Sequence, residues 1–155
     1  MEKKHFIKTN IITNIIIILV AVLGSVFVNL GMEWYATLVK PTEWVPSAVF
    51  GIVWTIIYVL TAITLFVWQK NSKVPTLVYV LFIINGILNV LWCLVFFTLN
   101  QLLLGAIIIL LNLIFAFWLI VQVYKNNWFY GLLIAIYPVW ISIATSLNLA
   151  TWILN

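Results

Sequence analysis

The sequence predicts an all-α membrane protein, a bundle of five transmembrane helices. Of its 155 residues, 66% are hydrophobic and only 6% are charged, which is more apolar surface than a soluble domain of this length can bury. Five apolar stretches contain no Asp, Glu, Lys or Arg, and each reaches the roughly 20 residues that a helix needs to cross a bilayer. Helices are the expected spanning form, because every backbone amide must be hydrogen-bonded inside lipid.

These stretches define a single membrane domain over residues 1–155. Lys3, Lys4 and Lys8 before the first stretch resemble the start of a secretory signal, but the run is long and no small-residue cleavage site ends it, so we expect a retained helix. The connection 31–46 is the only long one, and the short connections make neighbouring helices antiparallel. We expect helices at 11–30, 47–68, 76–98, 102–123 and 129–152.

The distribution of lysines predicts the orientation. With five spans, six of the seven lysines fall on the side of the N-terminus and only Lys40 falls on the other side. This asymmetry predicts a multi-pass protein of the cell membrane with a cytoplasmic N-terminus, an extracytoplasmic C-terminus and the 31–46 loop outside. The lysines are dispersed at segment ends, so we expect membrane lipid and no nucleic acid as a partner.

Several function classes are excluded by composition. His5 and Cys93 are the only residues of their types and Asp is absent, so we expect no metal site, no catalytic triad and no required cofactor. An ion-coupled pump is disfavoured because pumps need ionisable residues inside their spans. If the protein performs chemistry, oxidisable indoles or the ligand itself must carry it.

The nine tryptophans are the most informative residues. Tryptophan usually lies at the membrane–water interface, and five fit that position: Trp34, Trp44, Trp68, Trp128 and Trp152. A tryptophan deep in a span needs a partner or a ligand for its N–H group, and four lie inside apolar runs: Trp54, Trp92, Trp118 and Trp140.

Three of these inner tryptophans belong to stripes at three- or four-residue spacing, in which the side chains share one helix face. The stripes are Phe50, Trp54 and Tyr58; Asn89, Trp92 and Phe96; and Trp140, Ala144 and Asn148. Taken singly, each stripe is ordinary packing and each amide is ordinary helix–helix adhesion. Because the three lie at similar depth, we expect a flat, aromatic-lined pocket beneath the 31–46 loop, which would serve as a lid. Trp118 belongs to no stripe and is expected to pack or face lipid.

The same residues resemble a known family. The order Trp34-Tyr35-Ala36-Thr37-Leu38-Val39-Lys40-Pro41, Pro46, Phe50-Gly51-Ile52-Val53-Trp54 and Tyr58 is similar to the tryptophan-rich sensory protein (TspO) family. Asn89-Val90-Leu91-Trp92 with Phe96-Phe97, and Tyr137, Trp140, Ala144, Thr145, Leu147 and Asn148, extend the likeness over roughly residues 30–150.

The resemblance implies a five-helix membrane bundle, often a homodimer, that binds porphyrins such as protoporphyrin IX in a pocket capped by the first loop. It also implies that Trp54 and Trp140 are catalytic if the protein degrades porphyrin in a light- and oxygen-dependent reaction. By motif position, the family pocket corresponds to Tyr35, Pro41, Pro46, Phe50, Trp54, Asn89, Trp92, Trp140, Ala144 and Asn148. Tyr58, Phe96 and Tyr137 complete the ligand-binding residues that we expect.

Departures from the family pattern affect the loop more than the fold. Thr42-Glu43-Trp44-Val45-Pro46 lacks one proline of a pair, and Pro138 follows Tyr137 instead of preceding it, so the kink in the last helix is displaced. No lysine or arginine follows Lys125, so the sterol pattern of mammalian members is missing and we do not predict sterol transport. The leading hypothesis is a porphyrin-binding sensor or receptor, and the alternatives are a porphyrin-degrading enzyme, a carrier of apolar molecules and a bundle without a ligand.

Overall fold

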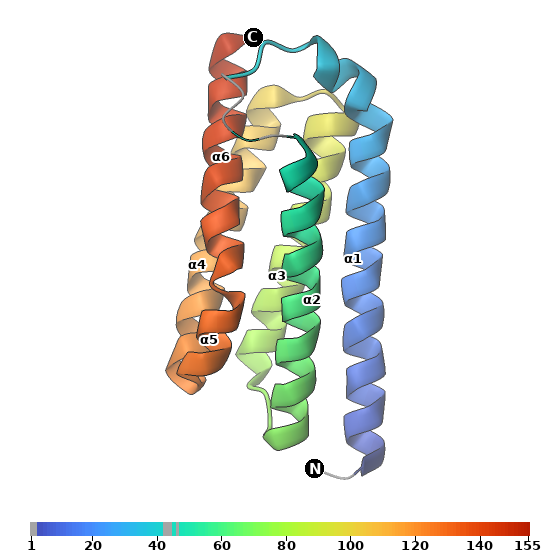
Figure 1. Ribbon diagram of the computed structural model, residues 1–155, viewed down its shortest axis with the longest axis vertical. Helices are drawn as coiled ribbons and strands as arrows, with labels where there is room; N and C mark the ends of the chain where they lie inside the picture. Colours follow the sequence, from blue (N-terminus) through green and yellow to red (C-terminus); the bar gives the residue numbers. More distant parts are fainter. Residues whose placement is uncertain (1–2, 42–44, 46) are drawn as a thin grey trace.

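The protein forms five membrane spans (Figure 1). The computed structural model describes residues 3–41, 45 and 47–155. Two spans consist of two segments each: α3 continues into the π-helical turn η1, and α5 continues into α6. The elements are α1 (Lys3–Thr37), α2 (Ser47–Asn71), α3 (Thr76–Cys93), η1 (Leu94–Thr98), α4 (Leu102–Asn126), α5 (Trp128–Ile134) and α6 (Ile136–Leu154). Five helices long and apolar enough to cross a membrane confirm the predicted fold class.

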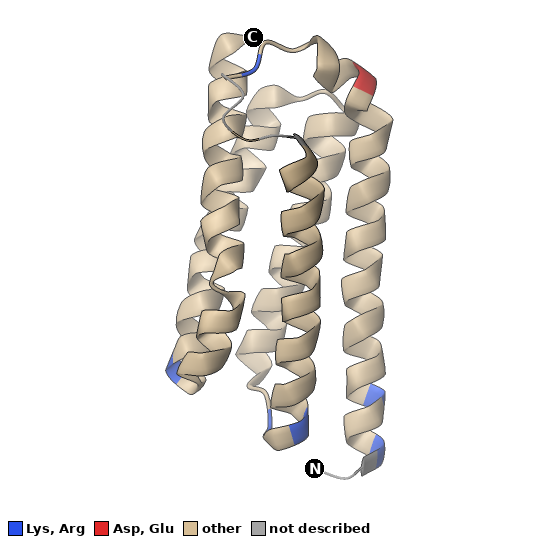
Figure 2. Cartoon of the chain, in the orientation of Figure 1, with Lys and Arg blue, Asp and Glu red and all other residues tan. Residues whose placement is uncertain are grey.

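The spans form a ring in which each packs against two neighbours. The extensive contacts are those of α4 with α6 and α3, of α1 with η1 and α3, and of α1 and α5 with α2. We call the end with the N-terminus the N-terminal end, and the end with residues 38–41 the loop end (Figure 1). Figure 2 shows that most lysines of the described residues lie at the N-terminal end. Glu33, near the end of α1, and Lys40, just after it, lie at the loop end.

The first helix is longer than the sequence indicated, and the expectation of a loop over 31–46 is wrong for its first half. The helix α1 continues through Thr37, because no proline interrupts it before Pro41 and because its last turn has surfaces to pack against. The rings of Trp34 and Tyr35 lie 5.9 and 6.1 Å from the ring of Phe96. The connection that could act as a lid is therefore 38–46, of which the structure describes residues 38–41 and 45.

Glycines on both sides hold the π-helical turn in place. A Cβ atom on Gly31 of α1 would lie 2.0 Å from the backbone oxygen of Phe97, and one on Gly105 of α4 would lie 2.9 Å from the Cβ of Phe96. The turn itself contains the wide hydrogen bond from the Leu99 N–H to the Leu94 carbonyl, at 2.9 Å. Such π-turns occur frequently at functional sites. This one carries Phe96 and Phe97, two aromatic rings of the hydrophobic core towards the loop end.

The last span is broken where the sequence predicts a kink. Pro138 has no N–H to donate to the carbonyl of Ile134, and the helix is interrupted at Ala135 between α5 and α6. The break places Tyr137 at the start of α6, fully inside the bundle with 9% of its surface exposed. The Asn127 side chain begins α5 by accepting hydrogen bonds from the N–H groups of Phe129 and Tyr130, at 3.0 and 3.2 Å.

Two hydrophobic clusters make up the core, one towards each end. The cluster towards the loop end contains Trp92, Phe96 and Trp140, and the cluster towards the N-terminal end contains Trp68 and Tyr130, whose rings are 5.1 Å apart. Trp68 is only 3% exposed, so its expected place at the membrane interface is wrong: it faces α5 inside the bundle.

Candidate functional site

The three predicted stripes meet inside the bundle towards the loop end. Trp92 and Phe96 on α3 and η1, and Tyr137, Trp140 and Ala144 on α6, are buried members of one hydrophobic cluster. Tyr35, Phe50 and Trp54 are partly buried and pack against the same cluster. The structure thus brings together residues that lie up to about a hundred positions apart in the chain.

The contacts between these residues are mostly between aromatic rings. The ring of Phe50 meets that of Trp140 edge to face at 5.1 Å. Trp54 stacks on Tyr58 at 5.7 Å and lies 6.4 Å from Tyr137. These separations lie in the range in which aromatic pairs attract each other. In this structure these rings pack against one another and so fill the space between α2 and α6 towards the loop end.

Four of the predicted site residues carry a buried polar atom that has no hydrogen-bond partner among the described residues. These atoms are the indole Nε1 atoms of Trp92 and Trp140 and the Oδ1 atoms of Asn89 and Asn148. All four side chains are at most 5% exposed. An unsatisfied buried polar group costs about 1–3 kcal/mol, and native proteins contain few of them. Two donors and two acceptors of this kind within one aromatic region are therefore the clearest indication of a binding site.

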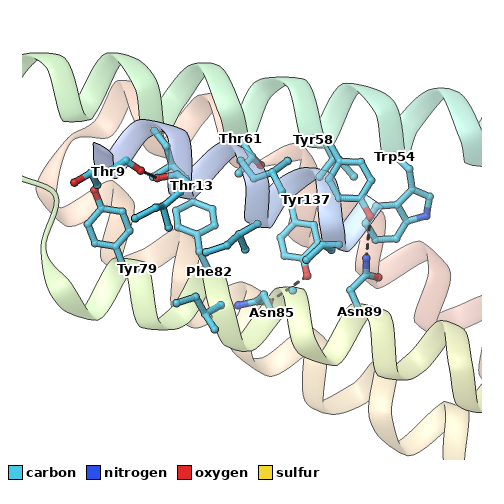
Figure 3. Close-up of a pocket in the computed structure, with 18 residues that line it drawn as sticks. Thr9, Thr13, Trp54, Tyr58, Thr61, Tyr79, Phe82, Asn85, Asn89 and Tyr137 are labelled. Carbon is cyan, nitrogen blue, oxygen red and sulfur yellow. Dashed lines mark hydrogen bonds between the residues drawn. The ribbon is translucent and has the colours of Figure 1, made fainter. Parts of the chain in front are cut away.

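A cavity of about 270 Å³ lies beside this aromatic region, between α1, α2 and α3 (Figure 3). Trp54, Tyr58, Asn89 and Tyr137 line its end nearest the loop. The Asn89 Nδ2 atom donates to the Tyr58 hydroxyl at 3.1 Å, which leaves the Oδ1 atom of the same amide free. Four of the expected site residues thus border open space, while six others belong to the packed cluster: Tyr35, Phe50, Trp92, Phe96, Trp140 and Ala144.

A buried amide network supports the cavity wall at Tyr137. The Tyr137 hydroxyl lies 3.2 Å from the Asn85 Oδ1 atom and 3.0 Å from the Asn112 Oδ1 atom. One phenolic proton cannot serve both oxygens. Turning the Asn112 amide by half a rotation lets its unpartnered Nδ2 atom donate to the phenol oxygen. The Asn85 Nδ2 atom is already satisfied by the carbonyls of Leu81 and Phe115, so this network fixes the tyrosine ring in place.

The described start of the loop is tied to the end of α1 and to the C-terminal residue of the chain. Lys40 donates from Nζ to the Tyr35 carbonyl at 3.0 Å and lies 4.5 Å from the centroid of its ring. The Asn155 side chain exchanges two hydrogen bonds with the Val39 backbone, at 3.0 and 2.8 Å. Pro41 is partly buried, and Pro46 lies outside the described residues.

The sequence did not indicate that α1 contributes to the cavity. Ile12, Ile16 and Val20 line it from α1, and Thr13 and Thr9 add hydroxyl groups. Nearly every position of this helix is apolar, so no stripe distinguishes the cavity face from the lipid face. In the sequence, only Thr9 and Thr13, which are four residues apart, could have indicated which face of α1 lines the cavity.

The described residues contain no group of three or more His, Cys, Asp or Glu side chains that could bind a metal. Cys93 is a free, buried thiol within the hydrophobic cluster. The site therefore offers indole and amide hydrogen-bonding groups, phenols and aromatic faces, which suit binding of a flat, largely apolar molecule.

Comparison with known proteins decides the family. The sequence profile of the TspO/MBR family matches residues 13–153. The chain belongs to the TspO/MBR family. It is 34% identical over 134 residues to the tryptophan-rich protein TspO of Archaeoglobus fulgidus, covering 85% of this chain and 87% of that protein. It is 33% identical over 138 residues to the protein of the same name from Chlorobaculum tepidum, with 85% and 86% covered.

A third TspO/MBR relative is protein CrtK of Rhodobacter capsulatus, which is 27% identical over 125 residues and covers 79% of this chain and 78% of that protein. The relatives cover most of the membrane domain, so family membership includes all three helices that carry the stripes. The aromatic cluster, the four unpartnered atoms and the cavity are thus features of a tryptophan-rich TspO/MBR protein.

Proposed function

We propose that this protein is a tetrapyrrole-binding membrane sensor or receptor, with protoporphyrin IX as the ligand class. The observation that carries the proposal is the set of two indole donors and two amide acceptors buried without partners among aromatic rings. Protoporphyrin IX is a flat aromatic macrocycle with two propionic acid groups at its edge, which can accept hydrogen bonds from the indole N–H groups and, when protonated, donate to the amide oxygens. Its faces suit stacking against indole and phenol rings.

Binding requires the cavity to enlarge. Its volume of about 270 Å³ is just below the ~300–1,000 Å³ usual for sites of small ligands. The first helix has the least packing to resist such a movement: 6% of its most apolar stretch is buried, against 39% for the α3 span. We propose that α1 and the connection after it move outwards when the ligand binds, and that the ligand separates the rings of Trp54 and Trp140 from the aromatic rings that they contact.

The test is a titration of the purified protein with protoporphyrin IX, followed by tryptophan fluorescence. The double variant Trp54→Phe, Trp140→Phe should bind at least tenfold more weakly. The matched control is Trp118→Phe, Trp128→Phe, which removes two tryptophans that are 45% and 63% exposed and should bind like the unmodified protein. Equal affinity of both double variants would refute the site.

A second candidate function is oxidative degradation of the bound porphyrin under light. The observation that favours it is a contact chain of oxidisable rings at the cavity, in which Trp54 lies beside Tyr58 and Tyr137. Aerobic illumination of the complex should give a new absorbing product faster than free porphyrin does. The Trp54→Phe, Trp140→Phe variant should lose this acceleration at porphyrin concentrations that saturate it, and a rate equal to that of free porphyrin would contradict the enzymatic function.

The orientation and assembly are part of the same proposal. We propose that the N-terminal end faces the cytoplasm, because most lysines of the described residues lie there (Figure 2), and that the protein works as a homodimer in the cell membrane. Labelling of single cysteines placed at Lys125 and Lys40, in a background without Cys93, tests the orientation. Mass measurement of the detergent complex tests the dimer.

A further inference from the structure

The cavity continues from the aromatic site to the N-terminal end of the bundle. Away from Trp54 its walls are aliphatic and aromatic side chains such as Ile16, Ile17 and Phe82. At the N-terminal end of the cavity, Thr9 and Tyr79 also line a second hollow of about 110 Å³. Figure 3 shows Thr9 and Tyr79 together at one end of the cavity and Trp54 and Asn89 at the other.

The two hollows differ in the chemistry of their walls. The larger is almost wholly apolar apart from its ends, whereas the smaller is lined by His5, Lys73, Gln69, Ser72 and Thr76 besides the shared residues. The two hollows meet at Thr9 and Tyr79, and we call them together the groove, with an apolar body and a mouth that carries one lysine, one histidine and hydroxyl groups. That is the arrangement that an amphiphile with one aliphatic chain and an anionic head would match.

The length of the groove matches one leaflet of a bilayer. Along α1 its lining residues run from Thr9 to Val20, which is roughly 16 Å at about 1.5 Å per residue. The hydrocarbon core of a bilayer is about 30 Å thick, so one leaflet takes up about 15 Å. The apolar body therefore has the length of a single acyl chain that starts at the N-terminal surface.

The charge at this surface selects the head group. Lys4, Lys8, Lys70, Lys73 and Lys125 lie at the N-terminal end, while Glu33, the single acidic residue that the structure describes, lies at the other end (Figure 2). A basic residue near the membrane surface attracts anionic lipid head groups. Lys73 and His5 are the charged or basic side chains that line the mouth itself.

The neck of the groove is already fixed by hydrogen bonds. Gln69 is 1% exposed; its Nε2 atom donates to the Thr13 hydroxyl at 2.9 Å, and its Oε1 atom accepts from the Asn10 Nδ2 atom at 3.3 Å. These bonds tie α2 to α1 and hold the Gln69 side chain at the neck of the groove. The two bonds do not involve Lys73 or His5, the basic residues at the mouth.

We infer that this groove binds an anionic membrane phospholipid, with one acyl chain between α1, α2 and α3 and the phosphate at Lys73 and His5. The acyl chain fills the space that α1, α2 and α3 leave between them. The phosphate pairs with basic side chains that have no carboxylate near them among the described residues. This inference does not depend on tetrapyrrole binding, since it rests on the apolar walls and on the basic residues at the N-terminal end of the groove.

The test uses delipidated protein in detergent, titrated with phosphatidylglycerol or with phosphatidylcholine of identical acyl chains, and native mass spectrometry to count bound lipids. We expect at least a fivefold preference for phosphatidylglycerol at the first bound lipid. The variant Lys73→Gln should reduce this preference to less than twofold. The control Lys125→Gln removes the same charge at the same end but on α4, outside the groove, and should keep the preference.

A second pair of variants tests the apolar body. Thr61→Phe places a ring inside the groove, because Thr61 lines it, and should lower binding of phosphatidylglycerol at least fivefold. The control Val121→Phe adds the same ring on an exposed face of α4 and should change nothing. The unfolding midpoint shows whether Thr61→Phe folds, and if it does not, the lysine pair decides alone.

Equal binding of the two lipids, or equal losses in Lys73→Gln and Lys125→Gln, would overturn the inference in favour of unspecific attraction to a basic surface. A folded Thr61→Phe variant that binds phosphatidylglycerol like the unmodified protein would equally overturn it. Binding of protoporphyrin to Lys73→Gln should be unchanged, which keeps the outcome separate from that of the proposed function.

Discussion

Replacing Gly31 with alanine should destabilise the protein, although the residue lies inside a helix. Alanine is the better helix former by about 1 kcal/mol, so propensity alone predicts a gain. The structure opposes it, because the new Cβ atom would lie 2.0, 2.3 and 2.8 Å from the carbonyl oxygen, the carbonyl carbon and the Cα atom of Phe97. All three are backbone atoms, so no side-chain rotation can relieve the contact.

The magnitude follows from the competition between these two effects. Forcing an extra methyl group into a packed contact costs about 1–3 kcal/mol, and the backbone contact here places the cost at the upper end. Set against the helix gain, the net loss is about 1–2 kcal/mol. For a chain of this size, 1 kcal/mol shifts the unfolding midpoint by roughly 2–4 °C, so the midpoint should fall by roughly 2–8 °C.

Gly51→Ala is the matched control. Gly51 is also helical, in α2, but a Cβ atom there would meet nothing within 4 Å. The same substitution should therefore raise the free energy of unfolding by up to about 1 kcal/mol. Thermal unfolding of both variants in the same detergent, followed by circular dichroism, makes the comparison. A Gly31→Ala protein at least as stable as the unmodified one would refute the close approach of α1 to η1.

Three further substitutions test the unpartnered Asn148 amide, the amide network of Tyr137 and the cap of α5. Asn148→Leu removes a buried oxygen without a partner among the described residues. It should leave the unfolding midpoint unchanged or raise it, by at most the equivalent of about 1–3 kcal/mol, and should weaken protoporphyrin binding at least fivefold. A clear loss of stability would show that the amide is satisfied. Tyr137→Phe strips the hydroxyl from Asn85 and Asn112 and should cost about 1–3 kcal/mol, visible as a lower midpoint; no change would mean that the network contributes nothing. Asn127→Ala removes the cap of α5 and should cost about 1 kcal/mol by the same assay, whereas a loss below a few tenths would show that water replaces the cap.

The sequence predicted the spans well because lipid leaves little choice. An uncharged apolar run of about 20 residues must become a helix in a bilayer, and all five runs do. The ends of helices were harder to predict. In the sequence, Gly31 looks like the first residue of a loop. In the structure it lies inside α1, where the absence of a side chain allows the close approach of the Phe97 backbone. Only the position of η1 reveals this role.

The candidate site was predictable where a helix carries a contrast between its faces. On α2, α3 and α6, aromatic rings and amides recur every three or four residues and mark the inner face. On α1 the recurring residues are isoleucine and valine on nearly all sides, so the groove behind Ile12, Ile16 and Val20 became visible only once α2 and α3 lay against them. The amide network of Tyr137 was missed for a related reason: Asn85 and Asn112 come from different helices, and their pairing depends on the break at Ala135.

The tryptophans show which kind of sequence evidence is reliable in such a protein. Distance from a helix end misplaced Trp68, which is 3% exposed although it lies at the end of its span, whereas Trp118 in mid-span is 45% exposed. Helical spacing placed Trp54, Trp92 and Trp140 correctly against one cluster. A helix turns by about 100° per residue, so the neighbours of a side chain depend on its face more strongly than on its depth. The binding hypothesis therefore belongs to the three tryptophans chosen by face, and the two of them that are fully buried are also the ones whose N–H groups lack a described partner.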